Sequence, residues 1–359
     1  MKIAQVAPLY ESVPPHSYGG TERVVSYLVE ELVRQGHNVT LFASGDSTTR
    51  ANLVSACERS LRLSSDCADP LTRHTILLDE VFSRSSEFDI LHFHTDYWHF
   101  PFSRFTGVPN VTTLHGRLDL PDLQPLFQHF HDIPLVSISQ AQRAPLMYGN
   151  WVGNVYHGLP PRLHSLHEHS GDYLAFLGRI SPEKGLDRAI RIARRAGMRL
   201  KIAAKIDKVD RAYFAEEIAP LLEQPGIEYV GEITEREKGD FLGNAHAYLF
   251  PIEWPEPFGL TMIEAMACGT PTIAFRRGSV PEVLESNISG FIVDTEDEAL
   301  DAIKCCEKFD RRLCRAVFLK RFTDKRMAEE YLAIYQKLAE NDISIAPPRP
   351  LETDSPLVP

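Results

Sequence analysis

The sequence predicts an α/β protein made of two doubly wound, Rossmann-like domains that face each other across a cleft. Short apolar segments of strand length alternate with amphipathic helical segments along almost the whole chain, as in parallel sheets covered by helices. The alternation stops once, at 160–171, and then starts again. At 359 residues, each half is long enough to bury its own core. Such folds bind ligands at the carboxyl ends of their strands, which we expect to line the cleft.

The composition and charge are those of an ordinary globular protein. Hydrophobic residues make up 43% and charged residues 24%, which disfavours both a disordered chain and a fibrous repeat. No apolar run approaches the roughly 18 residues of a membrane-spanning helix, and the first residues form a strand pattern rather than a signal peptide. We therefore expect a soluble, cytoplasmic protein. The net charge of -11 disfavours a nucleic-acid partner and weakly disfavours docking on an anionic membrane.

No pattern in the sequence predicts a disulfide framework or a metal site. The six cysteines include no C-x-x-C pair, so we expect reduced, structural thiols. Two groups of histidines stand out, but neither has the carboxylate or thiolate partners of a zinc site. They are His92, His94 and His99, and His164, His167 and His169. A D-x-D pair for Mg²⁺ is also missing, and we predict no bound metal.

In the first half, the predicted elements begin with a strand at 2–7 and a loop at 8–20. A helix follows, with Thr21 as its N-cap, an apolar face at helical spacing and Gly36 at its end. No element is assigned between about 50 and 80. Further strands are predicted at 39–43, 90–94, 111–114, 135–138 and 155–156.

In the second half, the alternation of strands and helices is more regular. Strands are predicted at 173–177, 200–204, 228–230, 248–250, 272–274 and 291–293. Helices are predicted at 186–196, 211–223, 235–243, from about 259 onward, at 296–308 and at 324–340. We place the units at 1–158, at 159–322, at 323–345 for a helix that packs back toward the first half, and at 346–359 for a disordered tail.

The loop after the first strand contains Gly19 and Gly20 immediately before the helix. It lacks the G-x-G-x-x-G spacing of a dinucleotide site, and no P-loop occurs in the chain. Nicotinamide chemistry and P-loop phosphoryl transfer are therefore disfavoured. Two glycines before a helix still let backbone N–H groups approach a ligand closely. On the loop alone, a simple turn is an equally good interpretation.

The most informative segment runs from 255 to 269 and contains two glutamates. Pro257 keeps Glu256 extended on a loop after a strand, and the helix can start only after this proline. The free N–H groups of 258–262 then form an anion site that suits a phosphate. Glu264 lies one to two turns into the helix, close enough to bond a neighbouring group such as a ribose. The alternative is that Glu256 caps the helix and Glu264 is solvated.

Three further side chains follow strand ends, where open α/β sheets bind ligands. Arg179 and Lys184 come after the strand at 173–177, and together they could neutralise a diphosphate without a metal. His115 comes after the strand at 111–114. Taken singly, the two cations could equally be solvated and the histidine could belong to a turn.

Together these residues resemble the signature of the retaining family 4 glycosyltransferases with the GT-B fold. The resemblance covers about 1–340 and is more specific in the second half. It implies an N-terminal acceptor domain, a C-terminal nucleotide-sugar donor domain, and transfer of a hexose without a metal or other cofactor. The residues that carry it are Arg179 and Lys184, Glu256 and Glu264 within 255–269, the Gly19–Gly20 loop, and Leu114, His115 and Gly116.

The resemblance also implies roles for individual residues. Those expected to act on the transferred sugar and the leaving diphosphate are His115, Arg179, Lys184 and Glu256. Those expected to bind the donor around them are Gly19, Gly20, Lys205, Phe258, Gly259, Leu260, Thr261 and Glu264, with Glu264 on the ribose. Two positions depart from the family pattern. Ala203-Ala204-Lys205 stands where glycine is frequent, and His157-Gly158 replaces Asn-Gly in the hinge.

The sequence motifs do not identify the donor sugar, its nucleotide or the acceptor. We favour UDP-glucose, while GDP-mannose and UDP-N-acetylglucosamine serve relatives with nearly the same motifs. The acceptor is expected to be a sugar, lipid-linked or small-molecule hydroxyl in polysaccharide or glycolipid synthesis, at most peripheral to the inner membrane. The alternatives are a glycoside hydrolase that uses both glutamates, a GT-B epimerase or phosphorylase, and an inactive nucleotide-sugar binder.

Overall fold

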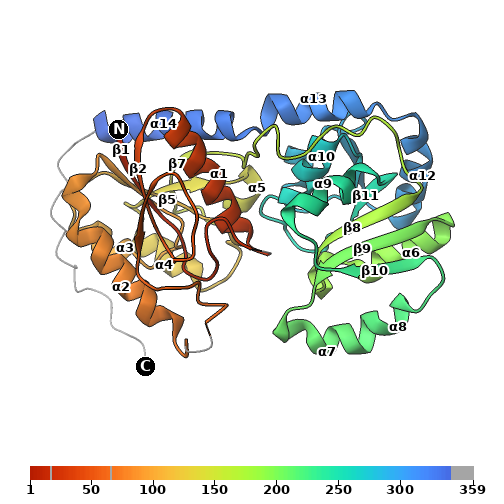
Figure 1. Ribbon diagram of the computed structural model, residues 1–359, viewed down its shortest axis with the longest axis horizontal. Coiled ribbons are helices and arrows are strands. Elements are labelled where there is room, and N and C mark those ends of the chain that lie inside the picture. Colours follow the sequence, from red (N-terminus) through yellow and green to blue (C-terminus); the bar gives the residue numbers. More distant parts are fainter. Residues whose placement is uncertain (17, 65–66, 341–359) are drawn as a thin grey trace.

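The computed structural model describes residues 1–16, 18–64 and 67–340, and it consists of two α/β units side by side (Figure 1). The first unit contains a seven-stranded sheet and the second a six-stranded sheet, each with parallel neighbours. The predicted fold class is therefore confirmed. The expected tail at 346–359 lies outside the described residues.

The first sheet has the strand order β3-β2-β1-β4-β5-β6-β7, so its direction of winding reverses between β1 and β4. Such a reversal opens a crevice at the carboxyl ends of the two strands. The strands are β1 Lys2–Val6, β2 Asn38–Ala43, β3 Asn52–Ser55, β4 Ile90–Phe93, β5 Asn110–Thr113, β6 Pro134–Ser137 and β7 Asn150–Asn154. The helices are α1 Gly20–Arg34, α2 Pro70–Ser83, α3 Phe100–Ser103, α4 Leu123–His129 and α5 Gln140–Arg143.

The second sheet has the order β10-β9-β8-β11-β12-β13, with the reversal between β8 and β11. Its strands are β8 Tyr173–Arg179, β9 Arg199–Lys205, β10 Ile227–Gly231, β11 Ala247–Phe250, β12 Thr272–Phe275 and β13 Gly290–Val293. The first helices are α6 Leu186–Ala196, α7 Arg211–Tyr213, α8 Ala219–Leu222, α9 Glu235–Gly243 and α10 Leu260–Cys268. They are followed by α11 Val280–Val283, α12 Glu296–Cys305, α13 Arg311–Arg321 and α14 Asp324–Glu340.

Some local predictions are wrong at element boundaries. The N-cap of α1 is Gly19 and not Thr21. The loop passes so close to this position that a Cβ on Gly19 would lie 2.7 Å from the Cβ of Pro15. The strand expected at 155–156 lies earlier, because β7 pairs with β6 from Asn150 onward. The segment without an assignment contains β3 and α2.

Helix α13 was not predicted at all. Its buried residues include Cys314, Val317 and Phe318, and it packs against α10. Five of its eleven residues are basic, and its leucines, Leu313 and Leu319, are exposed, so the apolar residues do not form one clear stripe and give a weak periodic signal. Packing against α10, rather than a strong local pattern, defines this helix.

The chain crosses between the two units twice at one place. Backbone hydrogen bonds join Leu159 to Phe322 at 2.9 Å and to Asp324 at 3.0 Å, so the outgoing and returning segments are held together. Helix α14 then packs on α1 of the first unit, above its sheet (Figure 1). Tyr335 accepts a hydrogen bond from Gln5 at 2.9 Å, which ties α14 to β1. Within the described part of the chain, no helix combines the length and apolar character needed to cross a membrane.

Candidate functional site

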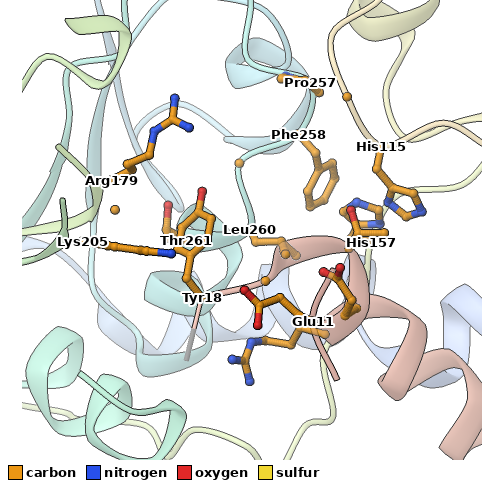
Figure 2. A pocket seen from close by; sticks show the side chains of 18 of the residues that line it. Glu11, Tyr18, His115, His157, Arg179, Lys205, Pro257, Phe258, Leu260 and Thr261 are labelled. Carbon is orange, nitrogen blue, oxygen red and sulfur yellow. The ribbon is translucent and has the colours of Figure 1, made fainter. Parts of the chain in front are cut away.

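A pocket of about 530 Å³ lies between the two units, at the carboxyl ends of their central strands. All residues that the sequence analysis assigned to catalysis or donor binding line this pocket. Figure 2 shows Arg179 and Lys205 on one side and His115 and His157 on the other, with Phe258 between them. The fold therefore brings together residues from five separate segments, each at the carboxyl end of a strand. The residues in question are Gly19, Gly20, His115, Arg179, Lys184, Lys205, Glu256, Phe258, Gly259, Leu260, Thr261 and Glu264.

Glu256 lies on the loop between β11 and α10 and is only 8% exposed. Its Oε2 accepts hydrogen bonds from Lys184 Nζ and from Trp254 Nε1, both at 2.7 Å. The backbone is fixed as well, because Ser279 N donates to the Glu256 carbonyl at 2.9 Å. The predicted alternative, that Glu256 caps α10, is wrong, since Gly259 is the N-cap and no side-chain cap bond is made. A rigid carboxylate therefore faces the pocket.

The carboxyl ends of β8 and β9 supply two cations to the same pocket. Arg179 and Lys205 are register partners at the ends of these strands. Arg179 forms an ion pair with Glu183, and Lys205 Nζ lies 3.2 Å from Asp207. Burial alone would lower the pKa of Arg179, but the Glu183 carboxylate raises it above its ordinary value. The guanidinium is therefore charged at any working pH and can bind an anion.

The N-terminus of α10 points its first N–H groups into the pocket region. Gly259 caps the helix in the left-handed conformation, at φ 80°, which favours glycine. Leu260 and Thr261 begin the helix and line the pocket. The first N–H groups of a helix have no intrahelical acceptor and carry the positive end of the helix dipole. This end can bind a phosphate, as the sequence predicts.

Glu264 lies inside α10, one turn from its start, and it is buried rather than solvated. Its Oε1 accepts a hydrogen bond from Lys238 Nζ at 2.8 Å. Its Oε2 is also buried and has no hydrogen-bond partner among the described residues, although Glu264 lines the pocket. That oxygen can accept a hydrogen bond from a hydroxyl group of a ligand.

An ionic network behind Glu264 links the two units. Glu235 on α9 lies 2.7 Å from Arg23 on α1 and 3.1 Å from Lys238. Burial would raise the pKa of Glu235, but His164, Lys238 and Arg23 lower it to about 2. Burial would likewise lower the pKa of Lys238, and Glu264 and Glu235 raise it. Both carboxylates are thus neutralised by side-chain cations.

The expectation that the linker histidines have no carboxylate neighbours is wrong for two of them, because His167 Nε2 lies 3.8 Å from Asp240 and His164 Nε2 lies 3.5 Å from Glu235. His164 offers a ring nitrogen within 4.8 Å of carboxylate oxygens of Glu235 and Glu264, a grouping that could hold a metal ion. A cation there would meet the charges of Arg23 and Lys238, which already occupy both carboxylates. The donor set therefore fits an ionic network better than a metal, and the prediction of no metal stays a prediction.

His115 is the pocket residue that the first unit contributes through β5. Its Nε2 is 2.9 Å from His94 Nδ1, and His94 Nε2 is 2.9 Å from Gln5 Oε1. Burial lowers the pKa of His115 to about 3, so the ring is neutral at physiological pH. Its ring stacks on His157, with 5.3 Å between centroids. His115 Nδ1 has no hydrogen-bond partner among the described residues, which leaves it available to a ligand.

Several pocket residues were missed by the sequence analysis. Trp254 could have been noticed because it directly precedes the segment at 255–269. Lys238 and Arg23 gave no signal, since their partners are far away in sequence. The wall from the first unit was also missed, and its polar and aromatic members include Tyr10, Glu11, Arg62, Asp96 and Trp98.

Two family profiles match the two units separately. The one described as Glycosyltransferase Family 4 matches residues 18–152, and the one described as Glycosyl transferases group 1 matches residues 164–308. Curated relatives match over part of their length. D-inositol 3-phosphate glycosyltransferase of Saccharomonospora viridis is 30% identical over 46% of this chain and 42% of its own. Alpha-maltose-1-phosphate synthase of Mycolicibacterium smegmatis is 26% identical over 46% of this chain and 48% of its own. The chain thus spans about half the length of these relatives.

Solved structures match over nearly the whole chain. AviGT4, a glycosyltransferase involved in avilamycin A biosynthesis, has a TM-score of 0.72 at 24% identity and covers 95% of this chain and 98% of its own. Sucrose-phosphate synthase of Thermosynechococcus elongatus has a TM-score of 0.76 at 15% identity, covering 94% and 98%. Anabaena HepE in complex with UDP has a TM-score of 0.70 at 17% identity, covering 95% and 99%. With both units matched by their profiles and the architecture shared with these structures, the chain belongs to the family 4 glycosyltransferases and has the GT-B fold.

Proposed function

We propose that this chain is a hexosyltransferase that moves glucose from UDP-glucose to an acceptor hydroxyl, with retention of configuration and without a metal. The observation that carries the proposal is the position of Glu256. It lies in one pocket with three cations and a helix N-terminus, so that a sugar and the diphosphate attached to it can be bound together. The chemistry of these groups matches a leaving diphosphate.

The second unit would bind the donor. As the bond between sugar and diphosphate breaks, negative charge grows on the phosphate oxygens, and preorganised donors stabilise that charge. Arg179, Lys184 and Lys205, with the first N–H groups of α10, would supply them. Glu264 would accept hydrogen bonds from the ribose through its free Oε2. Glu256 would accept hydrogen bonds from the hydroxyls of the transferred sugar.

His115 would contact the sugar as a neutral group. Since burial lowers its pKa to about 3, it can accept or donate a hydrogen bond without adding positive charge near the reacting carbon. In the proposed reaction it orients a hydroxyl and does not donate a proton from a charged ring. The glycine loop at Gly19 and Gly20 would allow the sugar or the phosphate to approach the backbone of the first unit.

The first unit would bind the acceptor. Its wall carries two aromatic side chains, Tyr10 and Trp98, whose ring centroids are 6.3 Å apart, and the carboxylates of Glu11 and Asp96. Aromatic faces and carboxylates suit a hydroxyl-rich molecule such as a sugar. We propose a role in polysaccharide or glycolipid synthesis, with a soluble or lipid-linked acceptor.

The choice of UDP-glucose is supported by Anabaena HepE, whose structures were solved with UDP, with UDP and glucose, and with UDP-glucose. Another relative is the gpi3 subunit of phosphatidylinositol N-acetylglucosaminyltransferase from Schizosaccharomyces pombe, 34% identical over 22% of this chain and 17% of its own. This relative makes UDP-N-acetylglucosamine a donor to be compared with UDP-glucose. The family resemblance adds GDP-mannose to the comparison.

Calorimetric titration with UDP, GDP and ADP, each with and without EDTA, tests the proposal. We expect UDP to bind, with the same affinity when EDTA is present. Tighter binding of GDP would move the donor to GDP-mannose, and loss of binding in EDTA would contradict the metal-free mechanism. Binding of none of the three nucleotides would contradict the donor site itself.

A further inference from the structure

We propose that Trp254 is a positioning residue for Glu256: its indole N–H holds one carboxylate oxygen so that the other stays open to the transferred sugar. This inference rests on the proposed function. Trp254 lies just outside the segment at 255–269 that the sequence analysis singled out. In the proposal it acts through Glu256 and does not contact the reacting atoms.

Among the described residues, both hydrogen bonds to the Glu256 carboxylate are on one oxygen. Trp254 Nε1 and Lys184 Nζ both donate to Oε2 at 2.7 Å, from two directions. Among the described residues, Oε1 makes no hydrogen bond, and Glu256 lines the pocket. Two donors on one oxygen define the plane of the carboxylate. One donor alone leaves the carboxylate free to rotate about its terminal torsion, which is broad for glutamate.

The backbone of the loop places the Trp254 indole next to the Glu256 carboxylate. Glu256 N donates to the Trp254 carbonyl at 2.8 Å, which closes a tight turn around Pro255. Pro257 then restricts Glu256 from the other side. This turn brings side chains two residues apart to the same side, where their polar ends meet. The arrangement thus depends on the local backbone and on the indole nitrogen.

Two cations also lie against the ring of Trp254. Lys184 Nζ lies 5.1 Å from the centroid of the indole ring, and the Arg117 guanidinium lies 5.7 Å from it. Arg117 belongs to the first unit, so the ring is held from across the cleft. Attraction between a cation and an aromatic face is strongest for tryptophan. The ring would therefore remain in place if only its N–H were lost from the bond to Glu256.

Trp254→Phe removes the N–H and keeps an aromatic ring, so it isolates the hydrogen bond. We expect kcat/KM for the donor to fall about ten- to hundredfold, the size of the loss for a hydrogen bond to a charged group. We expect the affinity for UDP to stay unchanged, because a phenyl ring keeps an aromatic face for Lys184. The lost N–H bonds only Glu256, which is assigned to the sugar.

Trp151→Phe is the matched control. Trp151 also donates through Nε1, to the Leu146 carbonyl at 3.1 Å, and it does not line the pocket. The Trp151→Phe variant measures how much activity is lost when any partly buried indole is replaced by a phenyl ring. We expect its kcat/KM to match that of the original chain. Equal losses in both variants would show that the Trp254 effect is structural and would overturn the inference.

A binding cycle with Glu256→Ala shows whether Trp254 acts through Glu256. Titrations with UDP-glucose and with UDP give the contribution of the sugar to affinity in each variant. We expect Trp254→Phe to reduce that contribution when Glu256 is present and to change nothing in the Glu256→Ala background. The same reduction in both backgrounds would overturn the inference. If the original chain bound UDP but not UDP-glucose, the proposed donor would fail separately, before any variant is compared.

Discussion

At the residue scale, every cation on the donor wall has a carboxylate partner within reach. A diphosphate that binds here must compete with those carboxylates, so binding is an exchange of ionic partners rather than the filling of an unpaired cationic site. The contribution of each cation to the affinity for a diphosphate therefore depends on the carboxylate whose ion pair it must give up. The pairs are Arg179 with Glu183, Lys184 with Glu256, Lys205 with Asp207, and Lys238 with Glu264.

Lys184→Ala and Glu256→Ala should each abolish transfer while the fold stays intact. Removing Lys184 takes away a charge from the diphosphate and leaves Glu256 with one donor fewer, so we expect kcat/KM to fall by at least about a hundredfold. The measurement is donor turnover with UDP release, together with a thermal melt.

Lys201→Ala is the matched control for the lysine variant. Lys201 lies on β9, its Nζ is 3.7 Å from Glu228, and it does not line the pocket. We expect normal turnover and a similar melt. Near-normal turnover in Lys184→Ala or in Glu256→Ala would show that the site is assigned wrongly.

At the element scale, short loops after the strands of the second sheet support one another. The loop after β12 contains Gly278, at φ 52°, directly against the loop that carries Glu256. A Cβ on Gly278 would lie 2.3 Å from the Glu256 carbonyl oxygen and 2.4 Å from the Glu256 nitrogen. Because backbone atoms cannot move aside as a flexible side chain would, the position of Glu256 depends on a glycine in a neighbouring loop.

Gly278→Ala should therefore displace Glu256 and reduce transfer strongly. A displacement of about 1 Å near a reacting centre can lower a rate by about a hundredfold. The control is Gly231→Ala, because Gly231 also has a positive φ, of 81°, but no atom within 4 Å of the position of its Cβ. Both variants should lose about 1 kcal/mol of stability from the positive φ, and Gly278→Ala should lose more because its Cβ meets the backbone of Glu256. Only Gly278→Ala should lose donor turnover, and equal turnover in the two would contradict the argument.

At the scale of the whole molecule, buried neutral histidines connect the first sheet to the returning C-terminal helix. His92 lies 2.6 Å from Tyr335 on α14 and 2.8 Å from Thr113 on β5. Burial, with smaller contributions from neighbouring charges, lowers the pKa values of these rings well below their ordinary range. The histidines concerned are His92, His94, His99, His115 and His157.

These histidines should make the protein less stable as the pH falls below about 6.5, the ordinary histidine pKa. In that range the unfolded chain binds protons and the native chain does not, so the free energy of unfolding must decrease. Each ring contributes up to about 1.4 kcal/mol per pH unit. Urea unfolding at a series of pH values measures the slope.

His92→Gln gives the control for this slope. A glutamine can still hydrogen-bond Tyr335 and Thr113 but binds no proton in this range. We expect a shallower decline of the unfolding free energy with falling pH, whatever the absolute stability of the variant. A free energy of unfolding that does not change between about pH 7 and about pH 5 would contradict buried neutral histidines.

The sequence by itself determined the alternation of strands and helices and the donor-side motif. Pro257 and Gly259 act on their own backbone, and Arg179 follows its own strand, so local chemistry alone identifies them. The same reasoning failed for α13, which is defined by packing against α10. It also failed for the N-cap at Thr21, because the loop passes so close to Pro15 that the helix begins after Gly19.

Only the tertiary structure decided which distant side chains meet. Arg23 reaches Glu235 because α1 and α9 come together across the two units, and Tyr335 reaches His92 because α14 returns to the first sheet. Residues so far apart in sequence leave no local pattern, since their contact depends on how whole elements pack. The sequence thus specified the chemistry of the donor wall, whereas packing of the two units produced the pocket between them and the ionic network behind it.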